Sequence, residues 1–207
     1  MLIEHRGKQP VVDTTAYVAP NATLVGDVRV GAGVRIMYGA VLDAEGSRVE
    51  VGEGAVVCEN AVLRATAAGD HDHPVFVGAD AFIGPHVTLL GCAVETCAYI
   101  ATGVTVLHGA TVGAGAVAAV GALVHANTVL PGEFLVPPNM VAVGNPVRIF
   151  GTEDRTAMTE AMRGADFVGT AFGVEIPWDN RLARYRRGTQ VRNEEFAAHR
   201  DDVVLSG

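Results

Sequence analysis

The sequence predicts an all-β fold, a parallel β-helix, followed by an α-helical tail. Aliphatic residues recur every six positions along most of the chain. This period matches neither an α-helix nor a simple strand, and it is typical of hexapeptide coils in which three short strands make one triangular turn. Small residues recur four positions after each aliphatic one, and Gly or Ala often follows it directly, which lets the chain turn at each corner. The aliphatic positions in phase are Val18, Leu24, Val30, Ile36, Leu42, then Val51, Val57, Leu63, then Val77, Ile83, Leu89, then Val94, Ile100, Val106, Val112, Ala118 and Val124.

The repeat divides the chain into three parts. We expect a lead-in segment over residues 1–17, the β-helix over residues 18–150 and a C-terminal helical extension over residues 151–207. The period is interrupted twice, at Asp43–Glu50 and at Ala65–Phe76. Gly, Asp and Pro are frequent there, so both interruptions are expected to be loops between coils.

The tail contains two helix signals. Thr152 is a suitable N-cap for a helix that would continue to Arg163, and Asn193 with two glutamates opens a second, short helix to about Asp201. Between them lies a basic run, for which we expect either a solvated helix face, contacts with an acidic neighbouring subunit, or anion binding. Its members are Arg181, Arg184, Arg186, Arg187 and Arg192.

Composition limits the environment and the partners. The chain has 207 residues and a formal net charge of −8, which argues against nucleic acid as a partner. It has no apolar run long enough to span a bilayer and no basic-then-apolar signal at its start, so we expect a cytoplasmic protein without a membrane partner. Its three cysteines are an odd number, and no disulfide framework is expected.

Four segments resemble the γ-class carbonic anhydrase family. They read AVLDAEG (40–46), VGEGAVVCENAVLRA (51–65), VFVGADAFIGPHVTLLGCAV (75–94) and VAVGNPVRIF (141–150), and the last is shared with hexapeptide acyltransferases. The resemblance implies a left-handed β-helix and a homotrimer. It also implies active sites between subunits, where two histidines of one chain and one of the next hold zinc.

This chain departs from the family at the zinc ligands. The three histidine positions correspond to Arg64, Pro85 and Leu90, while Asp43 and Glu45 fall near the Arg and the Asp of the family's Arg-Gly-Asp loop. Catalytic zinc needs three protein donors and one open position, and neither Pro nor Leu has a side-chain donor. A permanently protonated arginine cannot act as a ligand either. We therefore expect neither bound zinc nor carbonic anhydrase activity.

The repeat also predicts which residues meet. Leu63, Leu89, Val106 and Val124 share one face, so Arg64, Leu90, His108 and His125 should project near one another. In a trimer like that of the family, Arg64 and His108 of one chain would meet Glu59 and His86 of the next.

Three functions remain open. In the first, Arg64 and Glu59 bind a small molecule and His108 or His86 acts as general base. This suits acyl transfer from a coenzyme A thioester without a required metal. In the second, a hydratase or hydrolase metal site has moved to His71, His73, His86 and His108. In the third, the chain is a non-catalytic structural homotrimer whose polar residues pair across the interface.

Overall fold

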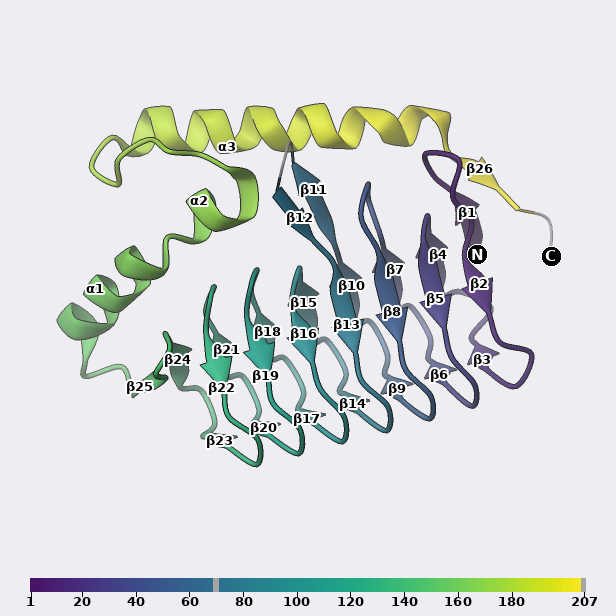
Figure 1. The fold of residues 1–207 in the computed structure, drawn as a ribbon, viewed down its shortest axis with the longest axis horizontal. Coiled ribbons are helices and arrows are strands. Elements are labelled where there is room, and N and C mark those ends of the chain that lie inside the picture. The colour runs from purple at the N-terminus through teal and green to yellow at the C-terminus, as the bar shows by residue number, and fades with distance from the viewer. Residues whose placement is uncertain (69–70, 206–207) are drawn as a thin grey trace.

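The chain folds into a left-handed parallel β-helix with helices packed along one edge (Figure 1). The computed structural model describes residues 1–68 and 71–205. Three sheets form the sides of the prism, named here face 1, face 2 and face 3 after the first strand of each. Face 1 contains β1 (Leu2–Glu4), β4 (Thr23–Val25), β7 (Val41–Asp43), β10 (Val62–Arg64), β15 (Thr88–Leu90), β18 (Thr105–Val106), β21 (Leu123–Val124) and β24 (Val141–Val143), with antiparallel β26 (Val203–Val204) and β25 (Arg148–Phe150) at its two ends.

The other two sides are entirely parallel. Face 2 contains β2 (Val11–Val12), β5 (Val28–Val30), β8 (Val49–Val51), β13 (Val75–Val77), β16 (Ala93–Val94), β19 (Thr111–Val112) and β22 (Val129–Leu130). Face 3 contains β3 (Tyr17–Val18), β6 (Arg35–Ile36), β9 (Val56–Val57), β14 (Phe82–Ile83), β17 (Tyr99–Ile100), β20 (Val117–Ala118) and β23 (Leu135–Val136).

The core is the stack of aliphatic side chains that the six-residue period predicts. On face 1, Leu63 lies in register with Leu89, and Leu89 with Val106. All three side chains are fully buried. Face 3 has the same register, because Val57 pairs with Ile83 and Ile83 with Ile100. Stacked coils thus bring residues distant in sequence within one strand spacing, about 4.8 Å.

The β-helix begins earlier than the sequence suggested. The expected lead-in, residues 1–17, already carries β1 and β2, which pair in parallel with β4 and β5 of the next coil. The weak aliphatic phase before Val18 hid this first coil, which the C-terminal strand β26 closes by pairing with β1.

One of the two expected loops has regular structure. Within the interruption expected at Asp43–Glu50, residues 44–48 form a loop between β7 and β8. The one expected at Ala65–Phe76 contains the antiparallel strands β11 (Thr66–Ala68) and β12 (His71–His73). This hairpin projects from the corner between faces 1 and 2, toward the C-terminal helices (Figure 1).

The tail forms more helix than expected. Helix α1 (Arg155–Ala165) starts three residues after the predicted cap and runs through Gly164, and α2 (Phe167–Phe172) was not predicted. Helix α3 (Arg181–Phe196) begins twelve residues before the predicted Asn193 and leads into the 3-10 helix η1 (Ala197–Asp201). Asn180 caps it by accepting a hydrogen bond from the Ala183 backbone nitrogen. The predicted start at Asn193 was wrong, because the basic run, for which a helix face was one expectation, forms one continuous helix with the residues that follow it.

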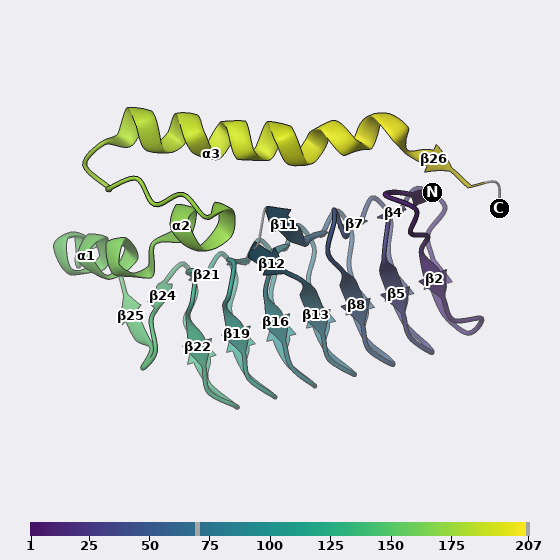
Figure 2. The same cartoon turned by 45° about the horizontal axis from the view of Figure 1, so that its top comes forward.

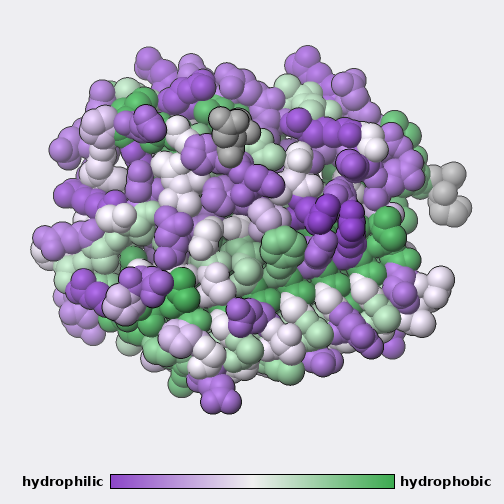
Figure 3. All heavy atoms as spheres, viewed as in Figure 1, coloured by the Kyte–Doolittle hydropathy of each residue, from purple (hydrophilic) through white to green (hydrophobic). Residues whose placement is uncertain are grey.

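Helix α3 runs back along the whole stack of coils. Figures 1 and 2 show it alongside the edge that carries the β11–β12 hairpin, ending near β1. Its outer surface is mostly hydrophilic, whereas hydrophobic side chains are visible on the exposed coils below (Figure 3). Among the described residues, no helix combines the length and the apolar character that crossing a membrane requires.

Candidate functional site

Within one chain, the predicted site residues fall into two groups at opposite edges of face 1. Arg64 and Leu90 end β10 and β15, next to each other at the corner toward face 2. Glu59 and His86 lie at the corner between faces 3 and 1, where the His86 backbone nitrogen donates to the Glu59 carbonyl oxygen at 3.0 Å. His86 is exposed and adopts a left-handed backbone with a φ of 58°. The two groups can therefore meet only between copies of the chain.

Arg64 is paired inside its own chain. Asp43 lies directly opposite it on β7, and the guanidinium lies 2.5 Å from Asp43 Oδ2 and 4.0 Å from Glu45 Oε1. The side chains of Asp43 and Glu45 are 4% and 0% exposed, compared with 28% for Arg64. Phe196 of α3 stacks on the other side, with its ring centroid 4.9 Å from the guanidinium carbon. The positive charge of Arg64 is therefore largely used to balance two buried carboxylates.

A chain of hydrogen bonds extends this cluster to both ends of the protein. His199 bridges Glu45 Oε1 at 3.2 Å and Asp202 Oδ2 at 2.9 Å, and Asp202 also contacts His5 Nδ1 at 2.6 Å. Burial disfavours protonated His199, but its bonds to the two carboxylates outweigh this and raise its pKa. Burial, then repulsion from Asp43, raises the pKa of Glu45 despite the His199 bond. The network ties η1 to the first coil, through His5, and to the third coil, through Glu45.

The sequence did not predict this network, because its histidines are isolated along the chain. His5, Glu45 and His199 form the one group, among described residues, whose potential metal-ligating atoms all lie within 4.8 Å of one another. Both nitrogens of each histidine already have partners, since His5 Nε2 accepts a bond from Arg6 Nε at 3.1 Å, its Nδ1 faces Asp202, and His199 bridges Glu45 and Asp202. Only Glu45 Oε2 in this group is buried without a partner. We interpret the group as an internal hydrogen-bonded network.

The four histidines predicted for a relocated metal site do not all come together within one chain. His73 is held by α2, where its Nε2 donates to the Thr170 carbonyl oxygen at 2.7 Å. His71 packs against Gly173, at which a Cβ would lie only 2.5 Å from His71 Nε2. His86 lies at the opposite edge of face 1. His71, His73 and His108 lie near one another, with ring centroids 6.4 Å apart for the first pair and 5.5 Å for the second. The four predicted histidines do not converge inside a subunit, because His86 is at the other edge.

His108 lies beneath the hairpin instead of in an open cleft. It is 1% exposed, and its Nε2 lies 2.9 Å from Thr66 Oγ1. The His73 ring packs against it edge-on at 5.5 Å, and Phe172 of α2 lies 5.8 Å away. Burial, with His73 and Arg192 nearby, lowers its pKa to about 3, so it is neutral at pH 7. The sequence placed His108 on the correct edge but did not show that its own chain covers it.

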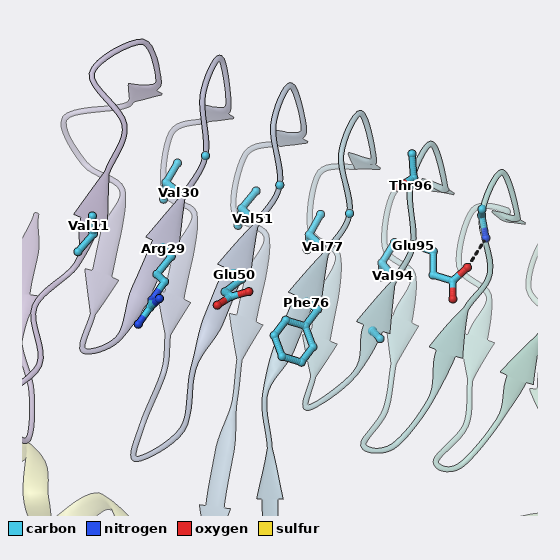
Figure 4. A pocket seen from close by; sticks show the side chains of 15 residues that line it. Val11, Arg29, Val30, Glu50, Val51, Phe76, Val77, Val94, Glu95 and Thr96 are labelled. Carbon is cyan, nitrogen blue, oxygen red and sulfur yellow. Dashed lines mark hydrogen bonds between the residues drawn. The ribbon is translucent and has the colours of Figure 1, made fainter.

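A concave surface on face 2 is open to solvent. It extends across successive coils, with a volume of about 980 Å³, and is lined by alternating apolar and charged side chains (Figure 4). Arg29 and Phe76 flank Glu50 on the two neighbouring strands, and Glu95 accepts a hydrogen bond from the Ala114 backbone nitrogen at 2.9 Å. None of the predicted site residues lines this groove.

Comparison with known proteins supports the family resemblance. No family model matches the chain. A 102-residue segment is 37% identical to γ-carbonic anhydrase 1 of Arabidopsis thaliana mitochondria, and covers 48% of this chain and 37% of that protein. A 100-residue segment is 42% identical to γ-carbonic anhydrase 3 of the same organism, and covers 47% and 39%. Over about half its length, this chain is similar to γ-class carbonic anhydrases. The matched segment thus spans about two fifths of those γ-carbonic anhydrases.

Other similarities concern proteins that are not described as carbonic anhydrases. The carnitine operon protein CaiE of Escherichia coli O157:H7 is 35% identical over 101 residues, which cover 49% of this chain and 50% of CaiE. A crystal structure of a putative acetyltransferase from Bacillus cereus aligns with a TM-score of 0.56 at 22% identity, covering 94% of this chain and 96% of that one. At that identity the alignment shows the shared fold alone.

Proposed function

We propose that this chain is a γ-carbonic anhydrase-like homotrimer that has lost zinc hydratase chemistry and binds a small molecule between subunits without a metal. The Asp43–Arg64 ion pair carries the proposal. The resemblance assigns a zinc-binding histidine to position 64, where this chain has a cation 2.5 Å from Asp43.

The chemistry of the side chains supports the loss of zinc. Leu90, adjacent to Arg64 on β15, has only hydrocarbon, and Pro85 has no side-chain donor. A divalent ion near Arg64 would also be repelled by the guanidinium, which solvent screens only in part because its side chain is 28% exposed. The residues present therefore do not fit the family's metal, and no step of the proposed function uses one.

The positions of the two polar groups favour a site between subunits. Arg64 lies at one edge of face 1, and Glu59 and His86 lie at the other. A cyclic trimer can place the first edge of one copy against the second edge of the next. The groups that the sequence suggests for binding and proton transfer would then share one cleft.

For acyl transfer, the geometry favours His86 over His108 as general base. His86 is exposed, whereas His108 is covered by the hairpin and α2. His86 would accept the proton of an acceptor hydroxyl as that oxygen attacks a thioester carbonyl. The coenzyme A thiolate would leave when the carbon–sulfur bond breaks. Coenzyme A is the proposed co-substrate on these grounds.

A non-catalytic structural trimer is the second candidate. It is favoured by the internal pairing of Arg64, which leaves little of its charge to bind an anion. The two candidates differ in ligand binding, since a ligand that binds only the folded state raises its stability.

Metal analysis tests the loss of zinc. Protein purified without chelators should contain far less than one zinc per subunit and should not hydrate carbon dioxide. The matched comparison is the triple variant Arg64→His, Pro85→His and Leu90→His, which restores three donors and should gain zinc. Stoichiometric zinc in the unmodified protein would refute the proposal.

Two further measurements separate transferase from scaffold. Light scattering coupled to gel filtration should give the mass of a trimer, and acetyl-coenzyme A should raise the melting temperature. His86→Ala should then abolish acetyl transfer while the trimer persists. If the protein is a trimer but acetyl-coenzyme A does not raise its melting temperature, the structural role is the correct one. If the protein is a monomer, both candidates are refuted.

A further inference from the structure

A largely apolar cavity lies inside each subunit, between the C-terminal helices and the edge of the β-helix. Its volume is about 630 Å³, within the range typical of small-molecule sites. Figures 1 and 2 show α1, α2 and α3 arranged around the end of the coils where this cavity lies. Its lining consists of His125, Met162, Phe167, Val168, Phe172, Trp178, Tyr185, Gly188, Thr189, Arg192, Asn193 and Phe196.

One glycine of α3, Gly188, borders the cavity. Gly188 is buried inside the helix, where glycine is normally unfavourable. A Cβ added there would meet only Val168 Cγ1, at an ordinary contact distance of 3.6 Å. The backbone therefore does not require glycine at this position, and a larger side chain would extend into the space that the aromatic residues surround.

Polar groups without partners face this apolar environment. His125 is 4% exposed and its Nδ1 is buried without a hydrogen-bond partner, as is Nε1 of Trp178. Burial lowers the pKa of His125, so its ring is neutral and has one N–H to donate. Trp178 Nε1 is a buried donor without an acceptor, and His125 Nδ1 is a second one in the tautomer that is protonated there. A ligand that supplies an oxygen would remove the penalty of leaving these donors unpaired.

Arg192 supplies the positive charge of the cavity. Its guanidinium lies between the rings of Phe196 and Phe172, at 4.4 and 5.1 Å, and 3.6 Å from Glu195 Oε2. None of the described residues that line the cavity is acidic. An arginine held between aromatic rings in a partly dry site is well suited to bind a carboxylate.

We propose that this cavity binds an apolar monocarboxylate, with its hydrocarbon among the aromatic rings and its carboxylate at Arg192 and His125. The site lies within one subunit and does not depend on the proposed interface function. Aromatic and aliphatic acids share this chemistry, and separate probes distinguish them.

The protein carries its own reporter, because Trp178 is the one tryptophan of the sequence and lines the cavity. Titration with 4-phenylbutyrate and with decanoate should give a saturable change in tryptophan emission and a higher melting temperature. The stronger response identifies the aromatic or the aliphatic class. The primary amides of the same acids should bind more weakly.

Two kinds of variant test the assignment independently. Gly188→Leu should abolish binding by filling the cavity, whereas the matched control Gly188→Ala should bind within about twofold of the original protein. Arg192→Met should weaken binding of the acid roughly tenfold or more and leave binding of the amide unchanged, and Arg192→Lys should retain part of the affinity. Circular dichroism would show that each variant is folded.

The proposal is overturned if neither acid gives saturable binding at millimolar concentration. It is also overturned if folded Arg192→Met binds acid and amide as the original protein does, because the carboxylate would then lie elsewhere. Should Gly188→Leu fail to fold, the Arg192 comparison alone decides.

Discussion

Replacing Arg64 with Met should expose the cost of the carboxylates buried beneath it. Methionine keeps an unbranched side chain in contact with Phe196 but removes the cation that lies 2.5 Å from Asp43 Oδ2. The side chains of Asp43 and Glu45, 4% and 0% exposed, would then share His199 as their nearest cation, at 4.0 and 3.2 Å. Two poorly solvated carboxylates would then face one another without the arginine that lies nearest to Asp43.

The expected loss of stability follows from this burial. Removing one partner of a buried ion pair costs about 3–5 kcal/mol. Because Arg64 is 28% exposed, solvent screens part of its charge, and we expect about 2–3 kcal/mol near neutral pH. Asp43→Asn in the same chain should recover part of the loss, with a coupling free energy of roughly 1–2 kcal/mol between the two positions.

Urea unfolding at several pH values measures both quantities. Glu45 has a pKa above its ordinary 4.5, chiefly through burial and then through Asp43, so its neutral form is favoured in the folded state. A carboxyl group whose folded pKa is raised favours folding below its unfolded pKa, and this contribution is lost as the pH rises through the folded pKa. The penalty of Arg64→Met should therefore be largest at neutral pH and shrink as acid protonates Glu45. A loss below about 0.5 kcal/mol, or one that is independent of pH, would refute this account of the site.

Three other perturbations test the coils and the helical cover. His199 has a raised pKa because its bonds to Glu45 and to a second carboxylate outweigh burial, so its stabilisation is complete below 6.5 and is lost as the pH rises through its folded pKa. His199→Asn should flatten that part of the stability–pH curve, and an unchanged curve would contradict the assignment. Gly78→Ala places a Cβ 2.5 Å from a backbone nitrogen of the next coil and should cost about 3 kcal/mol in urea unfolding. Gly33→Ala, with a φ of 67° and open space, should cost only about 1 kcal/mol, and equal losses would exclude the steric explanation. Leu89→Ala removes a fully buried side chain and should cost about 3 kcal/mol, whereas a loss below about 1 kcal/mol would mean that the column is loosely packed.

The period of six was sufficient to predict the coils because each hexapeptide has the same local structure, a short strand followed by a turn. An aliphatic side chain enters the prism and a small residue turns the corner, so counting along the chain gives the spatial neighbours. For this reason the spacing alone places Leu63, Leu89 and Val106 in one column, and the register of the strands confirms it. The first coil was missed where this repetition is weakest, in residues 1–17.

The residues that surround the candidate site could not be predicted from the repeat. His108 is buried by His73 of the hairpin and by Phe172, which lies far beyond it along the chain. Nothing local to His108 indicates that cover, because it depends on how α2 packs against the coils. The partners of Glu45 and Asp202 are likewise set by the return of the chain from η1 to the first coils.

Helix α3 connects the surroundings of Arg64 with the internal cavity. Phe196 has Arg64 at 4.9 Å and Arg192 at 4.4 Å from its ring centroid, so one aromatic ring touches both cations. The preceding residue, Glu195, accepts a hydrogen bond from the Ala67 backbone nitrogen of the hairpin at 3.0 Å. The end of α3 therefore holds the hairpin and covers Arg64, while Arg64 balances the carboxylates at the end of β7. Because Phe196 is common to both places, a ligand that draws Arg192 toward the cavity would also change the packing around Arg64.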